Sequence, residues 1–159
     1  MTDYTPEIYV RMGELALGRS PAILKATLGS CVGIAFLWRE RGLSALAHCM
    51  LPWAPEPGMP SGARYVDQAI SSLLRMLEAK PEHRTQLEAH LAGGSNMSRR
   101  EASDSRTPLV GQLNIAAALQ LLQAQGISVH SQDLGGIYAR QMRLDCAKAN
   151  VSVECVPMP

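Results

Sequence analysis

Two apolar segments close to each other in the first third of the chain stand out in the hydrophobic pattern. Residues 28–36 and 45–52 are almost continuously apolar, and the residues between them, 38–42, are mostly charged and end in a glycine. A short continuous apolar run that is bounded by turn residues is typical of a buried strand. We therefore predict two antiparallel strands joined by a hairpin connection.

The rest of the chain alternates between further strand patterns and two helical patterns. Residues 65–79 and 111–125 carry apolar side chains at the helical period and predict two amphipathic helices. In the second helix, we expect the apolar residues to face the core, namely Leu113, Ala116, Ala117, Leu121 and Leu122. Residues 98–108 are polar without a period and predict a mobile surface loop. The further predicted strands are residues 7–12, 13–17, 22–28, 87–92, 127–133, 138–145 and 150–156.

Many short strands, two helices and a largely antiparallel order indicate the α+β class. The chain has 159 residues, of which 47% are hydrophobic, so residues 1–159 are expected to form a single domain with a substantial core. The pattern alone does not distinguish a two-layer sandwich from an arrangement with more layers.

Composition narrows the possible partners. The formal net charge is +1, which favours neither nucleic acid nor a membrane surface, and one Phe, two Trp and four Tyr offer few surfaces for base stacking. The chain has no apolar run of about 18 residues and begins without a signal-peptide pattern, so we expect no membrane insertion. We expect its four cysteines to be reduced thiols in a cytosol that bind no metal, because they form no C-x-x-C pair.

One pair of residues in the two apolar segments indicates a catalytic function. Cys31 follows Gly29 and Ser30 at the start of the first predicted strand, and His48 lies within the second. A thiol beside an imidazole is the minimal unit of a cysteine hydrolase, since the imidazole accepts the thiol proton. Backbone N–H groups around Gly29 and Ser30 are candidate donors for a developing oxyanion.

Two alternatives remain open on the residues alone. Cysteine is often buried as a small hydrophobic residue, which would give Cys31 a purely structural role. A redox pair of Cys31 and Cys49 requires both thiols within disulfide distance. Because Cys49 follows His48 directly, we expect it to face the opposite side of its strand.

Five segments of the chain resemble the chemoreceptor glutamine deamidase family, CheD. They occur in the family's order and together span about residues 8 to 155. The segments are Thr27–Gly33, Ala47–Pro52, Leu91–Met97, Val110–Asn114 and Asp133–Arg140. The resemblance implies a sandwich with mixed sheets and helices outside, in the layer order α/β/β/α.

The resemblance also implies a function. Members of the family convert specific glutamines of methyl-accepting chemoreceptors to glutamate and release ammonia, as a bacterial cytoplasmic step in chemotaxis. The implied partners are the helical cytoplasmic domain of such a receptor and a CheC-type phosphatase, and no cofactor is implied. The alternative is a family member without turnover that acts as a receptor- or phosphatase-binding adaptor.

The resemblance assigns roles to particular residues. Cys31 would be the nucleophile that forms a thioester, and His48 the acid and base. The family carries a threonine five or six residues before its cysteine as a third catalytic group, and these positions hold Ala26 and Lys25 here. Thr27 is the nearest threonine and is the candidate for orienting His48, provided that a backbone bulge turns it inward.

Three later residues are candidates for the substrate or oxyanion site, alongside Gly29 and Ser30. Gly93 and Gly94 permit a close backbone approach to the active centre, and Asn114 is a helix cap or an active-site hydrogen-bonding group. Asp133 and Arg140 are expected to pair near a second Gly-Gly turn.

Overall fold

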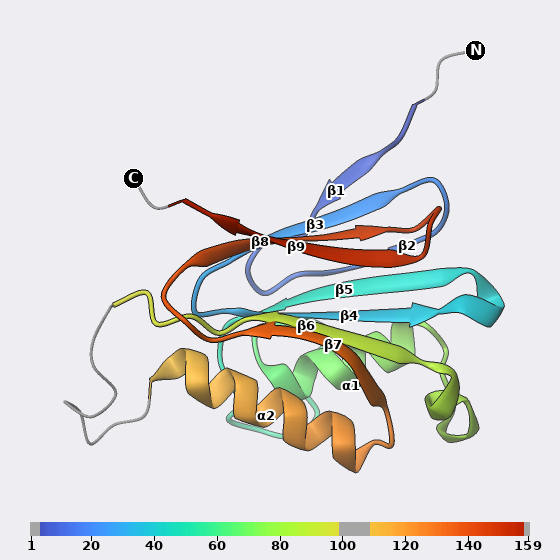
Figure 1. Ribbon diagram of the computed structural model, residues 1–159. Coiled ribbons are helices and arrows are strands. Elements are labelled where there is room, and N and C mark those ends of the chain that lie inside the picture. Colours follow the sequence, from blue (N-terminus) through green and yellow to red (C-terminus); the bar gives the residue numbers. More distant parts are fainter. Residues whose placement is uncertain (1–3, 99–108, 158–159) are drawn as a thin grey trace.

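The computed structural model of the protein describes residues 4–98 and 109–157, which form one layered unit (Figure 1). Apart from Ser98, the predicted loop over 98–108 lies outside the described residues. The strands are β1 (Glu7–Tyr9), β2 (Leu15–Gly18), β3 (Ile23–Leu28), β4 (Val32–Trp38), β5 (Leu43–Cys49), β6 (Glu88–Gly93), β7 (Ser128–Leu134), β8 (Ala139–Asp145) and β9 (Asn150–Val156). The helices are α1 (Val66–Met76), α2 (Val110–Ala124) and the 3₁₀ turns η1 (Arg39–Arg41) and η2 (Pro81–Gln86). No helix in this part of the chain combines the length and the apolar character that crossing a membrane requires.

The strands form two mixed sheets. The four-stranded sheet has the order β1-β3-β8-β9, and the five-stranded sheet has the order β2-β5-β4-β6-β7. The β1–β3 and β6–β7 pairs are parallel and the other pairs are antiparallel. The predicted hairpin is the β4–β5 pair, where Gly42 adopts a left-handed φ of 63° after η1. The α+β class with mixed sheets is confirmed.

Strand β4 is buried along its whole length because both faces of its sheet are covered. One face packs against the four-stranded sheet, where Ala35 and Leu37 meet Leu24 and Met142. The other face packs against the helices, where Phe36 and Trp38 meet apolar side chains of α1. A strand covered on both sides needs apolar residues at every position, which explains the uninterrupted apolar run in the sequence.

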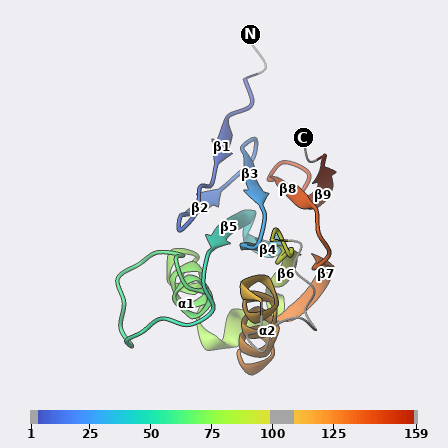
Figure 2. The ribbon, with the colours of Figure 1, turned by 90° about the vertical axis from the view of Figure 1, so that its left-hand side faces the viewer.

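Both α-helices cover the same sheet, so the layer order is β/β/α (Figure 2). The resemblance implied α/β/β/α, and this part of the expectation is wrong for the described residues. The physical reason is visible in β8 of the four-stranded sheet, where buried and partly exposed residues alternate strictly. Such alternation belongs to a sheet with one covered face and one face in contact with water.

The predicted inward face of α2 is confirmed in part, since Ala117 and Leu122 are buried and Leu121 packs against the core. Leu113 is 38% exposed and Ala116 is also exposed, whereas Asn114 is fully buried. Helix α2 is oriented so that Asn114, the predicted helix cap or active-site hydrogen-bonding group, faces the strands. This position is polar because the Asn114 side chain donates hydrogen bonds to two backbone carbonyls.

Candidate active site

The register of the β4–β5 hairpin makes Cys31 and His48 diagonal neighbours. His48 in β5 pairs with Gly33 in β4, and Cys31 lies two residues before Gly33. Residues two apart on a strand share a face, and diagonal neighbours on one face are within reach of long side chains. Cys31 and His48 are only 8% and 4% exposed. The register of the hairpin therefore places the two residues that the sequence singles out as diagonal neighbours, with Cys31 one residue before the start of β4.

The hydrogen bond at Nδ1 fixes which nitrogen of His48 can act as a base. Nδ1 lies 2.9 Å from the carbonyl oxygen of Val10. A carbonyl can only accept, so Nδ1 carries the proton, and Nε2 of the neutral ring holds a free lone pair. Nε2 is buried and has no hydrogen-bond partner among the described residues. The arrangement leaves Nε2 available to accept a proton.

Burial sets the charge state of both groups. It lowers the pKa of His48 below its usual range, although the Val10 carbonyl and the charge of Glu14 act in the opposite direction. Burial also raises the pKa of the Cys31 thiol, which its own backbone N–H offsets only in part. At neutral pH the site therefore holds a thiol beside a neutral imidazole, and the proton moves when the thiol attacks.

The segment of Gly93, Gly94 and Ser95 supports the loop that contains Cys31 through backbone contacts. Gly94 donates its N–H to the Cys31 carbonyl at 2.8 Å, and Ser95 donates to the Gly29 carbonyl at 2.9 Å. Gly93 has a φ of 103°, and a Cβ at this position would overlap the Cys31 carbonyl oxygen. Only glycine allows this approach between the two backbones.

Asn114 holds the two strand ends together from the helix layer. Its Nδ2 donates to the carbonyl of Ser30 at 3.1 Å and to the carbonyl of Met50 at 3.0 Å. One side chain of α2 thus bridges the segment before β4 and the segment after β5. Asn114 is a buried positioning group, which is a different role from helix capping.

These contacts also orient the predicted oxyanion donors. A trans peptide is planar, so the direction of each carbonyl fixes the opposite direction for the next N–H. The bonded carbonyls of Gly29 and Ser30 therefore set the directions of the N–H groups of Ser30 and Cys31. The N–H of Ser30 therefore points away from Ser95, and the N–H of Cys31 points away from Asn114.

Comparison with known proteins shows to which family the chain belongs. A family model described as CheD chemotactic sensory transduction matches residues 50–155, which is two thirds of the chain. The chain belongs to the CheD family.

Relatives cover the rest of the chain, including the Cys31 end. The protein is 34% identical to "Probable chemoreceptor glutamine deamidase CheD 2" of Ruegeria sp. (strain TM1040), over 95% of this chain and 93% of that one. It is 34% identical to a CheD protein of the same description in Bdellovibrio bacteriovorus, over 95% and 96% of the two chains. An archaeal relative from Methanococcus vannielii is 35% identical over 91% and 92%.

A solved structure supports the fold alone. A Neisseria meningitidis protein of the DUF152 family superimposes with a TM-score of 0.51 at 12% sequence identity. The alignment covers 83% of this chain and 64% of that one.

Thr27 does not face His48. It lies in β3, which pairs with β8 in regular register from Ile23 to Leu28, without the bulge that an inward Thr27 requires. Its neighbours Ala26 and Leu28 are fully buried between the sheets, so Thr27 faces outward and is exposed. The prediction that Thr27 orients His48 is wrong, and the Val10 carbonyl forms the hydrogen bond that orients the ring.

The predicted pairing of Asp133 with Arg140 is confirmed, and Arg140 also supports the segment from Gly93 to Ser95. Arg140 Nε contacts the Asp133 carboxylate at 2.9 Å. Its Nη1 donates to Ser95 Oγ at 2.7 Å and to the Gly93 carbonyl at 3.4 Å. This buried guanidinium therefore fixes the loop that in turn supports Cys31.

Cys49 faces the opposite side of its strand from His48, as predicted. Burial, with a smaller contribution from nearby Cys31, raises the pKa of the Cys49 thiol. Cys49 packs in the core on the helix side of the sheet, whereas Cys31 packs on the side of the four-stranded sheet. All four cysteines are free thiols. This placement favours the hydrolase hypothesis over the redox pair.

Exposed apolar side chains occur on segments that adjoin the site. A cavity of about 280 Å³ adjoins Ser30 and is lined also by Met97 and Val110 at the start of α2. Val110 is 43% exposed. Met12 and Trp53 are 63% and 46% exposed. Met12 precedes Gly13, whose N–H donates to the His48 carbonyl, and Trp53 follows β5 by four residues.

The described residues contain no group of three or more His, Cys, Asp or Glu side chains arranged to hold a metal ion. That the reaction needs no cofactor stays a prediction.

Proposed function

We propose that this CheD protein is a cytoplasmic protein-glutamine deamidase that converts glutamines of methyl-accepting chemoreceptors to glutamate. The observation that carries the proposal is Nε2 of His48, which is buried, unprotonated and without a partner among the described residues, diagonal to Cys31 across the β4–β5 hairpin. The names of the relatives, each a probable chemoreceptor glutamine deamidase, support the choice of substrate.

The first half of the proposed reaction forms a thioester. Cys31 Sγ attacks the carbon of the glutamine carboxamide while its proton passes to His48 Nε2. The carboxamide oxygen takes up the negative charge and accepts hydrogen bonds from the N–H groups of Ser30 and Cys31. The intermediate collapses when its C–N bond breaks, and the nitrogen leaves as ammonia with the proton from His48.

The second half returns the enzyme to its starting state. His48 Nε2 takes a proton from water, and the resulting hydroxide oxygen attacks the thioester carbon. The C–S bond then breaks, the proton returns to Cys31 Sγ, and a glutamate side chain is released. Each step uses only side chains and backbone groups of the chain and water.

The proposed substrate surface is formed by the apolar side chains around the site. Met12, Trp53 and Val110 are exposed apolar side chains on segments that adjoin the site, and such side chains suit contact with an amphipathic helix. The cytoplasmic domain of a chemoreceptor is helical, so a glutamine on such a face would reach Cys31. A CheC-type phosphatase is a second proposed partner, on the strength of the family resemblance alone.

The test is mass spectrometry of a chemoreceptor cytoplasmic fragment that has been incubated with the protein. We expect a mass gain of about one dalton for each glutamine converted, at positions that peptide mapping identifies. Cys31→Ala is expected to abolish the gain. Cys155→Ala, which removes an exposed thiol elsewhere in the chain, is the matched control and should retain it.

Two outcomes would contradict the proposal. A gain that persists in Cys31→Ala would exclude Cys31 as the nucleophile. Binding of the fragment by the folded wild-type protein without any gain would support the adaptor hypothesis instead.

A further inference from the structure

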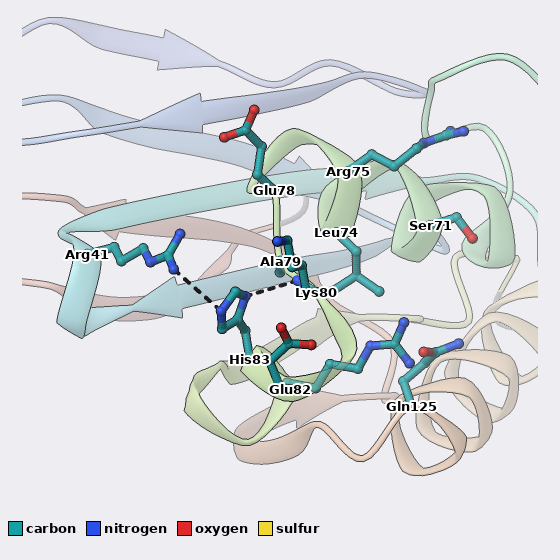
Figure 3. A pocket seen from close by; sticks show the side chains of 11 residues that line it. Arg41, Ser71, Leu74, Arg75, Glu78, Ala79, Lys80, Glu82, His83 and Gln125 are labelled. Carbon is teal, nitrogen blue, oxygen red and sulfur yellow. Dashed lines mark hydrogen bonds between the residues drawn. The ribbon is translucent and has the colours of Figure 1, made fainter.

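A cavity lies away from Cys31, at the opposite end of β4. It has a volume of about 740 Å³ and is lined by η1, η2 and the C-terminal ends of α1 and α2 (Figure 3). Cavities that bind small molecules measure roughly 300 to 1,000 Å³. Cys31 precedes β4 and Arg41 follows it, so the length of the strand separates this cavity from the proposed active site.

The cavity carries an excess of positive charge. Four of its lining residues are cations, namely Arg41, Arg75, Lys80 and Arg84, whereas two, Glu78 and Glu82, are anions. The ion pairs of the described residues involve other cations, and none of these four takes part in one. Within residues 4–98 and 109–157 the positive charge is therefore not neutralised by direct pairing.

Two hydrogen-bond donors face each other without an acceptor between them. His83 Nδ1 accepts the backbone N–H of Lys80 at 3.0 Å, so this nitrogen is unprotonated. An imidazole always keeps at least one proton, so His83 Nε2 carries it. Nε2 lies 3.4 Å from Arg41 Nη2, which is also a donor (Figure 3). An anionic oxygen beside the pair would accept a hydrogen bond from each.

Two further polar atoms in the lining have no partner. Arg84 Nε is a buried donor and Gln125 Oε1 is a buried acceptor, and neither forms a hydrogen bond within the described residues. Buried polar atoms nearly always have a hydrogen-bond partner, so an unpaired one needs a physical explanation. A bound molecule that offers an acceptor to the arginine and a hydroxyl or amino donor to the glutamine would, after small side-chain movements, satisfy both.

Helix electrostatics explains only part of the charge. Arg75 lies in the last turn of α1 and Lys80 follows it, where cations favourably meet the negative end of the helix dipole. Arg41 is in η1 and Arg84 is in η2, and neither follows from the dipole of α1. The guanidinium of Arg41 lies over the Trp38 ring, 4.2 Å from its centroid, a contact that supplies no formal negative charge. The inference therefore depends mainly on Arg41, His83 and Arg84.

We propose that this cavity binds the phosphate group of a small phosphorylated molecule. Donors reach the cavity from η1, η2 and α1, and a tetrahedral phosphate offers oxygens in several directions, whereas a carboxylate offers two in one plane. The volume exceeds the size of a phosphate, and Gln125 Oε1 needs a donor, so the remaining space accommodates an organic part with hydroxyl or amino groups.

The test is calorimetric titration of the full chain at constant ionic strength with pyrophosphate, adenosine monophosphate and adenosine. We expect saturable binding of the first two and no binding of adenosine. Arg41→Gln and Arg84→Gln, which lie on separate elements, should each weaken phosphate binding by about tenfold or more, because each removes a charge-assisted hydrogen bond. Tighter binding of adenosine monophosphate would assign an organic source of the phosphate, and tighter binding of pyrophosphate an inorganic one.

Arg19→Gln is the matched control, because Arg19 is exposed and lies outside the cavity. It should leave the affinity within about twofold of the wild type. The proposal is overturned if neither phosphate compound binds below about 10 mM. It is also overturned if the three arginine variants weaken binding equally, or if folded Arg41→Gln and Arg84→Gln, with unchanged melting temperatures, bind like the wild type.

Discussion

His48 donates its Nδ1–H to the backbone carbonyl of Val10, over 2.9 Å. This bond does for the ring what a carboxylate or hydroxyl does in many cysteine and serine hydrolases, since it fixes both the tautomer and the orientation. A backbone carbonyl carries no charge, so it stabilises a protonated imidazole less than a carboxylate would. Burial outweighs the upward effects of the Val10 carbonyl and of Glu14, and it keeps the pKa of His48 low.

The low pKa of His48 predicts the acid limb of the pH–rate profile. The base is active when Nε2 is unprotonated, so activity falls as the pH falls through the pKa of His48. Because burial lowers that pKa from 6.5, the midpoint of the fall in kcat/KM should lie below pH 6.5. Initial rates of ammonia release from a receptor fragment would measure it. A midpoint well above 6.5 would show that the active form needs a preformed thiolate.

Replacing Thr27 should leave the activity intact. Thr27→Val keeps the shape and the strand preference of the side chain and removes only its hydroxyl, which faces outward from β3. We expect kcat/KM and the melting temperature to stay within about twofold and about 2 °C of the wild type. A large loss of kcat at unchanged stability would show that the hydroxyl of Thr27 takes part in catalysis.

The close approach of Gly93 to Cys31 predicts a large loss of stability in Gly93→Ala. The added Cβ would overlap the Cys31 carbonyl, and alanine is strained at a φ of 103°. We expect the free energy of unfolding to fall by about 3 kcal/mol or more in denaturant titrations.

Gly58→Ala separates the strain from the clash. Gly58 also has a positive φ, of 73°, but nothing lies within 4 Å of an added Cβ. This variant should lose only about 1 kcal/mol. Equal losses in the two variants would mean that the contact with Cys31 carries no energy of its own.

The bridge formed by Asn114 predicts a loss of both stability and turnover. Asn114→Ala leaves the carbonyls of Ser30 and Met50 without their donor in a buried site, which should cost about 2–4 kcal/mol. Because Ser30 also carries a proposed oxyanion donor, kcat should fall more than KM changes. Gln120→Ala removes an exposed amide from the same helix and is the control for helix effects. If Asn114→Ala loses stability but keeps its kcat, the bridge is purely structural.

Much of the fold follows from hydrophobic patterning. The β4–β5 hairpin, α1 and the β8–β9 hairpin lie where the apolar periods predict them, because each buries a face that periodicity reveals. The face of α2 follows from it only in part, because the first turn buries the polar Asn114 and exposes Leu113. The layer order was also out of reach of patterning, because an alternating strand shows that one face is covered but not by what.

The candidate site shows a similar division. Sequence reasoning singled out Cys31, His48, Gly93 and Asn114, because their side chains or the lack of one carry a chemical signal. The role of Val10 was missed, because its contribution is a backbone carbonyl that every residue possesses. Thr27 was chosen by nearness in sequence, and the regular register of β3 turned it outward.

The most direct test of the account is a search for the thioester on Cys31. The wild-type protein is mixed with a glutamine-containing receptor peptide, quenched in acid within the first turnover and measured by intact mass. The account predicts an adduct equal to the mass of the peptide less ammonia, mapped to Cys31 and absent in Cys31→Ala. Ammonia release by a wild-type protein that never carries this adduct, together with ammonia release by Cys31→Ala, would contradict the account.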